Sequence, residues 1–307
     1  MKYLICIISI CISVSCAEWR FRTKVNLGLI DLDSPPPLGA NITVYDFRLF
    51  RETPVWELTK AAVIQDTEKM KKIVREGKLN VDYQESKFGE TLLSLEVKNE
   101  RYDSSKTLLE LGADPNKQEN SLSEGYSPIM YGASVKDLRL LRLLLEYGGN
   151  PNIEAKGKII SGTITYTPLI NASQDGKLEN VKLLIRAGAN IHFKDELGST
   201  PLKEALIHNH MDIVLYLLQN GIDYKQQFGT VSGKNYNTKE EYPQYIADRL
   251  RFNTLPLNSE RYKQKMKVVA FLKKNGIDYR ATPIPLAAIN EAKRLYPNYW
   301  EEYLEKY

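Results

Sequence analysis

Two stretches decide the fold of this chain. Residues 167–192 read T-P-L-I-N-A-S-Q-D-G-K-L-E-N-V-K-L-L-I-R-A-G-A-N-I-H, and residues 200–224 read T-P-L-K-E-A-L-I-H-N-H-M-D-I-V-L-Y-L-L-Q-N-G-I-D-Y. The second line begins at Thr200, 33 residues after Thr167. In each line the threonine hydroxyl can cap a helix, and the proline that follows fits the first helical position. A second helix follows in each line, and Gly188 and Gly221 are placed to end it in a left-handed conformation. The sequence therefore predicts the same helix–turn–helix unit twice in succession.

The apolar residues of both units recur at helical spacing. Leu169 and Ala172 are three residues apart, and so are Leu202 and Ala205, which places each pair on one face of a helix. The second helices carry their own apolar set, which consists of Val181, Leu184, Ile185, Val214, Leu217 and Leu218. We expect these faces to pack into a core that runs through consecutive units.

A period of 33 residues with a T-P-L opening resembles the ankyrin repeat. Further copies of the pattern align on four more glycines, Gly77, Gly112, Gly148 and Gly276. The first copy lacks the T-P opening, and in the sixth Tyr242-Pro243 takes its place. The resemblance implies an all-α fold, an ankyrin-repeat solenoid of about six helix–turn–helix repeats with β-hairpin fingers and capped ends.

Insertions lengthen the array at three places. Residues 153–166 contain I-I-S-G-T-I-T-Y, a β-rich run around a Ser-Gly turn, which predicts a hairpin finger. Residues 224–242 carry Phe228, Tyr236 and Tyr242 among small and polar residues, and residues 253–261 interrupt the sixth copy. Insertions in a repeat array emerge as loops, often on the binding face, so these segments are candidates for partner contacts.

The first residues, M-K-Y-L-I-C-I-I-S-I-C-I-S-V-S-C-A-E, are typical of a secretory signal peptide, with an early lysine, an apolar run and small residues. Residues 1–17 are predicted to contain the signal, with cleavage either before Cys16 or after Ala17. The first route follows from V-S-C, which resembles a bacterial lipobox and makes Cys16 the predicted lipidation site. All three cysteines lie in or at the edge of this leader. The exported domain is therefore expected to rely on its packed core rather than on disulfides.

Two segments outside the repeats are expected to cover the ends of the array. Residues 18–53 lack the repeat pattern and contain P-P-P and glycine, which favours an extended N-terminal cover segment. Such a cover is needed because a terminal repeat otherwise exposes its apolar face. Residues 54–282 hold the repeats. Residues 283–307 are predicted to form a capping helix that Pro297 ends, followed by an aromatic and acidic tail.

The composition is that of an ordinary soluble protein, with 43% hydrophobic and 26% charged residues and a formal net charge of +4. Basic runs at residues 69–72, 139–142 and 263–267 are interleaved with apolar positions, which indicates a solvated outer face rather than a nucleic-acid site. Asp31 and Asp33, in an extended segment, are interpreted as solvated carboxylates.

Reactive constellations are missing from the sequence. It contains neither a nucleophile-elbow motif nor a glycine-rich phosphate loop. The three histidines are His192, His208 and His210, and without cysteines beyond the leader they do not make a zinc site. His210 falls where ankyrin repeats commonly carry a structural histidine. The sequence therefore predicts no enzyme, no cofactor and no metal.

The ankyrin resemblance implies a protein partner that binds the concave face made by fingers and first helices. The residues that flank the small pair of each first helix point toward that face. The predicted partner-binding residues are Tyr131, Val135, Asn171, Gln174, Asp175, Glu204, Ile207 and His208. The same rule adds Lys60, Val63, Ile64, Leu95, Lys98 and Asn99 in the earlier copies. Many of the 19 tyrosines lie outside the repeat core, where they serve either as interface residues or as packing for the inserted loops.

The leader, the opening V-W-E-L-T-K-A-A and the inserted fingers resemble bacterial exported ankyrin proteins of the effector–immunity type. That resemblance implies a non-enzymatic periplasmic protein, monomeric when free, that neutralises a toxic secreted effector such as a lipase by stoichiometric binding. Contact with the outer membrane is expected only through an anchor at Cys16, and no nucleic-acid partner is expected. Two alternatives remain open: a periplasmic scaffold or chaperone for an envelope enzyme, and a secreted host-directed ankyrin effector.

Overall fold

The computed structural model of the 307-residue chain describes residues 31–34, 45–120, 125–159, 162–232 and 241–307. The predicted signal peptide, with its lipidation candidate Cys16, and Tyr236 lie outside these ranges. The chain divides into two compact units. Unit 1 comprises Met1–Tyr131 and Glu146–Gly149, and unit 2 comprises Gly132–Leu145 and Asn150–Tyr307.

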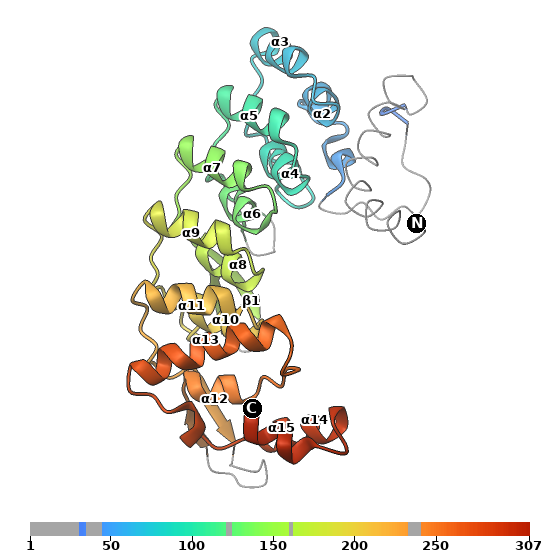
Figure 1. Ribbon diagram of the computed structural model, residues 1–307. Helices are drawn as coiled ribbons and strands as arrows, with labels where there is room; N and C mark the ends of the chain where they lie inside the picture. Colours follow the sequence, from blue (N-terminus) through green and yellow to red (C-terminus); the bar gives the residue numbers. More distant parts are fainter. Residues whose placement is uncertain (1–30, 35–44, 121–124, 160–161, 233–240) are drawn as a thin grey trace. The chain divides into compact units, whose positions relative to one another are not determined.

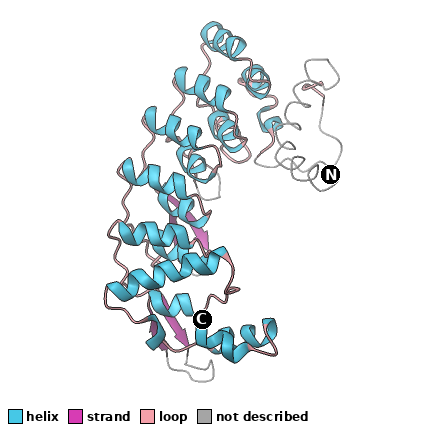
Figure 2. Cartoon of the chain, viewed as in Figure 1, coloured by secondary structure: helices cyan, strands magenta, loops and turns pink. Residues whose placement is uncertain are grey.

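Unit 1 is a ladder of short antiparallel helices (Figures 1 and 2). Its elements are η1 (Phe47–Phe50), α2 (Trp56–Val63), α3 (Thr67–Gly77), α4 (Leu92–Lys98), α5 (Tyr102–Glu110) and the first residues of α6 (Pro128–Ser134). Helix α2 packs against α3 and α4, and α5 packs against α3 and α4. Each of the helices α2 to α5 therefore contacts its partner in the pair and its counterpart in the neighbouring pair.

Unit 2 continues the helix pairs and adds two hairpins (Figure 2). Its helices are α7 (Leu138–Glu146, all but the last residue), α8 (Pro168–Gln174), α9 (Leu178–Arg186), α10 (Pro201–Ile207), α11 (Met211–Gln219), α12 (Ile246–Arg251), α13 (Glu260–Lys274), η2 (Tyr279–Ala281), α14 (Leu286–Leu295) and α15 (Trp300–Lys306). Its strands are β1 (Ala155–Ile159), β2 (Gly162–Tyr166), β3 (Gly229–Ser232) and β4 (Glu241–Gln244). None of the described helices combines the length and the apolar composition that crossing a membrane requires.

The predicted helix signals act as expected. Thr167 accepts a hydrogen bond from Ile170 N at 3.2 Å, and Thr200 accepts one from Lys203 N at 3.1 Å. Gly188 and Gly221 have φ angles of +90° and +82°, the left-handed conformation that ends a helix. In the first copy, however, Gly77 is the last residue of α3 and Lys78 takes the left-handed conformation.

The predicted core positions of α8 to α11 are buried. Leu169, Ala172, Leu202 and Ala205 are buried in the first helices, and in the second helices the buried residues are Val181, Leu184, Val214, Leu217 and Leu218. Only Ile185 of the predicted set is half-buried. The spacing of apolar residues along each helix was enough to identify the buried faces, because every repeat places its apolar residues at the same helical positions.

Strands β1 and β2 form the predicted hairpin, antiparallel from Ala155 opposite Tyr166 to Ile159 opposite Gly162. The second hairpin, β3–β4, was not predicted. It corrects the assignment of Tyr242-Pro243 to a helix start, because both residues lie in β4. The pairing extends to Gln244, whose carbonyl accepts a hydrogen bond from Phe228 N at 2.8 Å, so the backbone stays extended until Tyr245 and α12 follows.

The predicted tail after Pro297 is a second helix, α15, which packs against α14. Tyr303 and Tyr307 lie four residues apart, on one face of the helix, and both are buried. They form an apolar cluster with Ala292, flanked by Leu257, Tyr296, Trp300 and Leu304. Tyr303 and Tyr307 are therefore core residues, whereas Tyr299 of the same segment is exposed.

A buried lysine corrects the interpretation of residues 263–267 as a solvated face. Lys265 is fully buried in α13. Its Nζ donates to the Asn253 carbonyl at 3.0 Å and lies 3.6 Å from the centre of the Tyr307 ring. Burial, and then the charge of Arg251, lower the pKa of Lys265 to about 6. The rings of Tyr307, just after α15, and of Tyr279 in η2 lie against the lysine. These contacts come from distant residues, which the local charge pattern does not reveal.

Candidate protein-binding site

The predicted partner-binding residues of unit 2 lie mostly on α8 and α10, which pack side by side. Asp175 and His208 are exposed at the helix ends, and Ile207 is 40% exposed although it is apolar. Gln174 is half-buried beside Asp175. An acidic group, an imidazole and an apolar side chain are thus accessible on neighbouring helices.

Glu204 lies at the edge of this surface. One carboxylate oxygen accepts a hydrogen bond from Ser199 Oγ, and the other lies 3.9 Å from His208 Nδ1. The side chain of Glu204 is mostly buried, so its main contacts are within the protein. The hydrogen-bond partner of His208 Nδ1 is instead the backbone carbonyl oxygen of Glu204, at 3.0 Å.

His210 has a structural position. Its Nε2 lies 2.9 Å from the Gln174 carbonyl, which joins the end of α8 to the start of α11. The ring fills the space beside Gly176, where a Cβ would come within 2.5 Å of it. Gly176 also has a φ of +70°. This turn therefore requires glycine for two reasons, the close approach of the His210 ring and the left-handed backbone conformation.

Asn171 does not lie where the sequence places it. The side chain is buried, and within the described residues its Oδ1 accepts no hydrogen bond. Asn171 lies on α8, which packs against α10. Asn171 is therefore no direct contact for a partner in this conformation.

Val135 is half-buried after the end of α6, in unit 2. Its carbonyl accepts a hydrogen bond from Asn180 Nδ2 at 3.1 Å, and the same amide donates to the Ala133 carbonyl at 2.8 Å. The buried Asn180 therefore fixes the backbone of this turn. Tyr131 belongs to unit 1, so the two units hold the predicted site residues separately.

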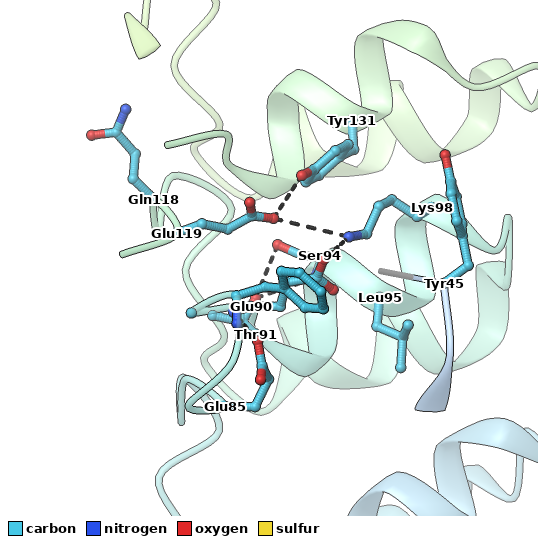
Figure 3. Close-up of polar contacts among 12 residues, drawn as sticks. Tyr45, Glu85, Glu90, Thr91, Ser94, Leu95, Lys98, Gln118, Glu119 and Tyr131 are labelled. Atoms are coloured by element: carbon cyan, nitrogen blue, oxygen red, sulfur yellow. Dashed lines mark hydrogen bonds and ion pairs between the residues drawn. The ribbon is translucent and has the colours of Figure 1, made fainter. Parts of the chain in front are cut away.

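Tyr131 points into a buried polar cluster in unit 1 (Figure 3). Its hydroxyl donates to Glu119 Oε1 at 2.6 Å, and Lys98 Nζ lies 4.6 Å from the centre of its ring. Lys98 forms an ion pair with Glu90 and lies 4.0 Å from Glu119 Oε1. Lys98 and Tyr131, both expected on the partner-facing surface, are therefore engaged with the protein's own carboxylates.

The turn before α4 places Glu90 in this cluster. Glu85 accepts hydrogen bonds from the backbone N–H groups of Lys87, Phe88 and Glu90, and this arrangement fixes the turn. Thr91 then caps α4 by accepting from Ser94 N. Lys98 lies two turns along the same helix, where its side chain can reach back to Glu90 (Figure 3).

Burial dominates the electrostatics of the cluster. It raises the pKa of Glu90 to about 7, although the charge of Lys98 opposes the shift. Burial and the neighbouring Glu119 also raise the pKa of Tyr131. Within the described residues, Glu90 Oε2 accepts no hydrogen bond. Sequence reasoning missed this cluster because its carboxylates come from turns rather than from the repeated helix positions.

We expect Glu90→Gln to change how stability depends on pH. The pKa of Glu90 is about 7 in the folded chain and 4.5 ordinarily, so the folded state binds this proton more tightly. Its stabilising contribution is full below pH 4.5 and is lost as the pH rises through 7. The difference in unfolding free energy between wild type and variant should change by roughly 3 kcal/mol over this range.

Urea unfolding at pH 4.5, 6 and 7.5 measures this difference. Glu68→Gln, at an exposed position of α3, is the matched control and should leave the wild-type profile unchanged. Lys98, Glu119 and Glu85 all influence Glu90, so the change belongs to the coupled cluster. Parallel pH profiles for wild type and Glu90→Gln would contradict the prediction.

The described ranges hold no group of three His, Cys, Asp or Glu side chains placed to bind a metal ion. The accessible side chains of α8 and α10 offer hydrogen bonds, charge and apolar area, which is the chemistry of protein recognition.

Comparison with known proteins identifies the repeats. A family model of ankyrin repeats matches residues 129–228 with three copies. Neurogenic locus notch homolog protein 1 of Mus musculus is 32% identical over 166 residues, which is 53% of this chain and 6% of that protein. Cyclin-dependent kinase inhibitor 2A of Monodelphis domestica is 33% identical over 110 residues, 36% of this chain and 58% of that protein. Protein PhlB of Serratia liquefaciens is 38% identical over 112 residues, 36% of this chain and 45% of that protein.

This chain spans less than two thirds of each of these relatives. The matched copies contain the T-P-L openings and the glycine stops that α8 to α11 display in the structure. The chain therefore contains ankyrin repeats, with three copies between residues 129 and 228.

Proposed function

We propose that this chain is a non-enzymatic binding protein that acts by stoichiometric contact with one protein partner. Ankyrin repeats imply a protein–protein interaction module, and proteins built from them are typically non-enzymatic. The observation that carries the proposal is the surface of α8 and α10, where Asp175, Ile207 and His208 are accessible on adjacent helices. Rigid helices hold these groups in place, so little ordering entropy is lost on binding.

The proposal extends the ankyrin array beyond the three matched copies. The pairs α2–α3 and α4–α5 of unit 1 pack together as α8–α9 and α10–α11 do in unit 2. About six repeats would then offer a long surface, with the hairpins as fingers and α14–α15 as a C-terminal cap. Long surfaces of this kind suit a protein partner better than a small ligand.

Our specific proposal is an immunity protein that neutralises a toxic secreted effector, such as a lipase, in the bacterial periplasm. The leader and the lipobox-like V-S-C at Cys16 support export and a lipid anchor. Two relatives support inhibition by binding and a bacterial setting: one is named as an inhibitor of a kinase, and the other comes from Serratia liquefaciens. Neutralisation needs only that the bound surface block the partner's own site.

We expect Asp175→Lys combined with Ile207→Ala to weaken partner binding at least tenfold and to leave the fold intact. Charge reversal removes complementarity, and truncation of an exposed apolar side chain removes contact area. Glu204 is left unchanged because Ser199 depends on it. The measurement is calorimetric titration with the partner, which is first captured by cross-linking in the native envelope and then purified.

Glu179→Lys is the control, since it reverses a charge on the exposed side of α9. A variant that binds as tightly as wild type would exclude the α8–α10 surface. Failure of any partner to bind wild type stoichiometrically would instead contradict the binding function itself.

A further inference from the structure

Asp33 is held by two donors from α2. Trp56 Nε1 donates to Asp33 Oδ1 at 2.7 Å, and Lys60 Nζ lies 3.1 Å from Oδ1 and 2.9 Å from Oδ2. Trp56 and Lys60 are four residues apart, so they lie one above the other on the same face of the helix. An indole N–H and an ammonium group thus converge on one carboxylate.

A third donor recognises the backbone of the same residue. Arg51 Nη2 donates to the Asp33 carbonyl oxygen. Phe47 stacks on the Trp56 ring, with centroids 6.0 Å apart and an angle of 9° between the planes. The stacking fixes the indole, so its N–H points in a constant direction. The three donors therefore bind both the side chain and the main chain of one acidic residue.

The contact of Asp33 with α2 can be broken at little cost in free energy, so another carboxylate can replace it. The Asp33 side chain is 56% exposed, and ion pairs in contact with solvent contribute little stability. Lys60 retains a second carboxylate partner, Glu57 at 2.6 Å, when Asp33 leaves. The hydrogen bonds from Lys60 and Trp56 lower the pKa of Asp33, so it is ionised at neutral pH. Breaking the contact exposes no unpaired buried charge.

We propose that Arg51, Trp56 and Lys60 form a receptor for an acidic residue on a surface loop of the partner protein, and that Asp33 occupies this receptor in the free chain. The inference rests on the proposed binding function and names the chemistry of one contact. Lys60 is also one of the positions that the ankyrin resemblance places on the concave face. The chain's own turn at residues 31–34 is the stand-in that shows which group fits.

A short acidic peptide tests the receptor without the partner. The probe is a fluorescent peptide with the sequence of residues 29–36, L-I-D-L-D-S-P-P, titrated into full-length protein. In wild type the internal Asp33 competes at an effective concentration in the millimolar range, so the peptide binds weakly. Asp33→Lys repels Lys60 and empties the receptor, and we expect at least tenfold tighter peptide binding.

Asp31→Lys is the matched control, because it makes the same charge change two residues away. Within the described residues, the Asp31 carboxylate accepts hydrogen bonds from Asp33 N and Ser34 Oγ of its own turn. The Asp31→Lys variant should bind the peptide as weakly as wild type does. Adding Lys60→Met to Asp33→Lys should abolish the gain, whereas adding Lys69→Met on α3 should not.

Equal binding by the Asp33→Lys and Asp31→Lys variants would overturn the proposal, since net charge alone would explain it. Tight peptide binding that persists when Lys60→Met is added to Asp33→Lys would also overturn it. The same holds if no variant binds the peptide at millimolar concentration. Circular dichroism of each variant confirms that the fold is retained. None of these outcomes bears on the α8–α10 surface, so the receptor can fail while the proposed function stands.

Discussion

Tyr303→Ala is expected to lower the free energy of unfolding by about 3–5 kcal/mol, the usual cost of removing a large buried aromatic side chain. Tyr303 is buried between α14 and the loop that follows α12. Its hydroxyl donates to the Leu255 carbonyl at 2.8 Å and accepts from Leu255 N at 3.0 Å. The substitution therefore leaves a cavity and two backbone groups without their partner.

Two further variants separate the causes. Tyr303→Phe keeps the ring and removes the hydroxyl, so it should cost about 1–3 kcal/mol for the unsatisfied Leu255 groups. Tyr299→Ala removes a ring that is 55% exposed and should change stability by no more than about 0.5 kcal/mol. Urea unfolding of the full chain, followed by circular dichroism, measures all three. Equal losses for Tyr303→Ala and Tyr299→Ala would show that α15 does not pack as described.

The second large effect is expected from Leu184→Ala, at about 2–5 kcal/mol. Leu184 is fully buried in α9, and its carbonyl accepts the hydrogen bond from Ala189 N that closes the helix end. The neighbouring α8 packs against α9, so the lost volume lies at a helix–helix contact. Backbone atoms cannot move to fill such a cavity without breaking the helix pair.

Leu183→Ala is the matched control for Leu184. Leu183 is the preceding residue of the same helix and is only half-buried. The chemical change is identical, so a smaller loss at Leu183 isolates the effect of burial. Differential scanning calorimetry provides a second readout, the melting temperature. An unchanged transition for Leu184→Ala would contradict the assignment of the core face of α9.

The helices of the middle repeats could be predicted because their signals are local. Thr167 and Thr200 each cap a helix by accepting a hydrogen bond from the N–H group three residues ahead, and Gly188 ends a helix through its own φ angle. These interactions need no distant partner, so they can be recognised in a linear sequence. The β1–β2 hairpin followed for the same reason, from β-forming residues on both sides of a short turn.

Burial of polar side chains could not be predicted in this way. Lys98, Lys265 and Asn171 occupy positions that look solvent-facing by helical periodicity, yet all three are buried. For the two lysines the contacts come from other elements: carboxylates of two turns for Lys98, and the Tyr279 and Tyr307 rings for Lys265. Periodicity gives the direction of a side chain, but not the element that packs against it.

The sequence alone determined the ankyrin repeats, their capped helices and the apolar faces that join them, because each repeat carries its own signals. Only the tertiary structure decided which charged residues meet. Glu90 and Lys98 are eight residues apart on one turn and its helix, and Glu119 joins them from another turn. Asp33 and Lys60 are 27 residues apart and meet where separate segments converge. Long-range contacts depend on loop paths that no local pattern encodes, and here those paths place the candidate receptor at Trp56 and the buried cluster at Tyr131.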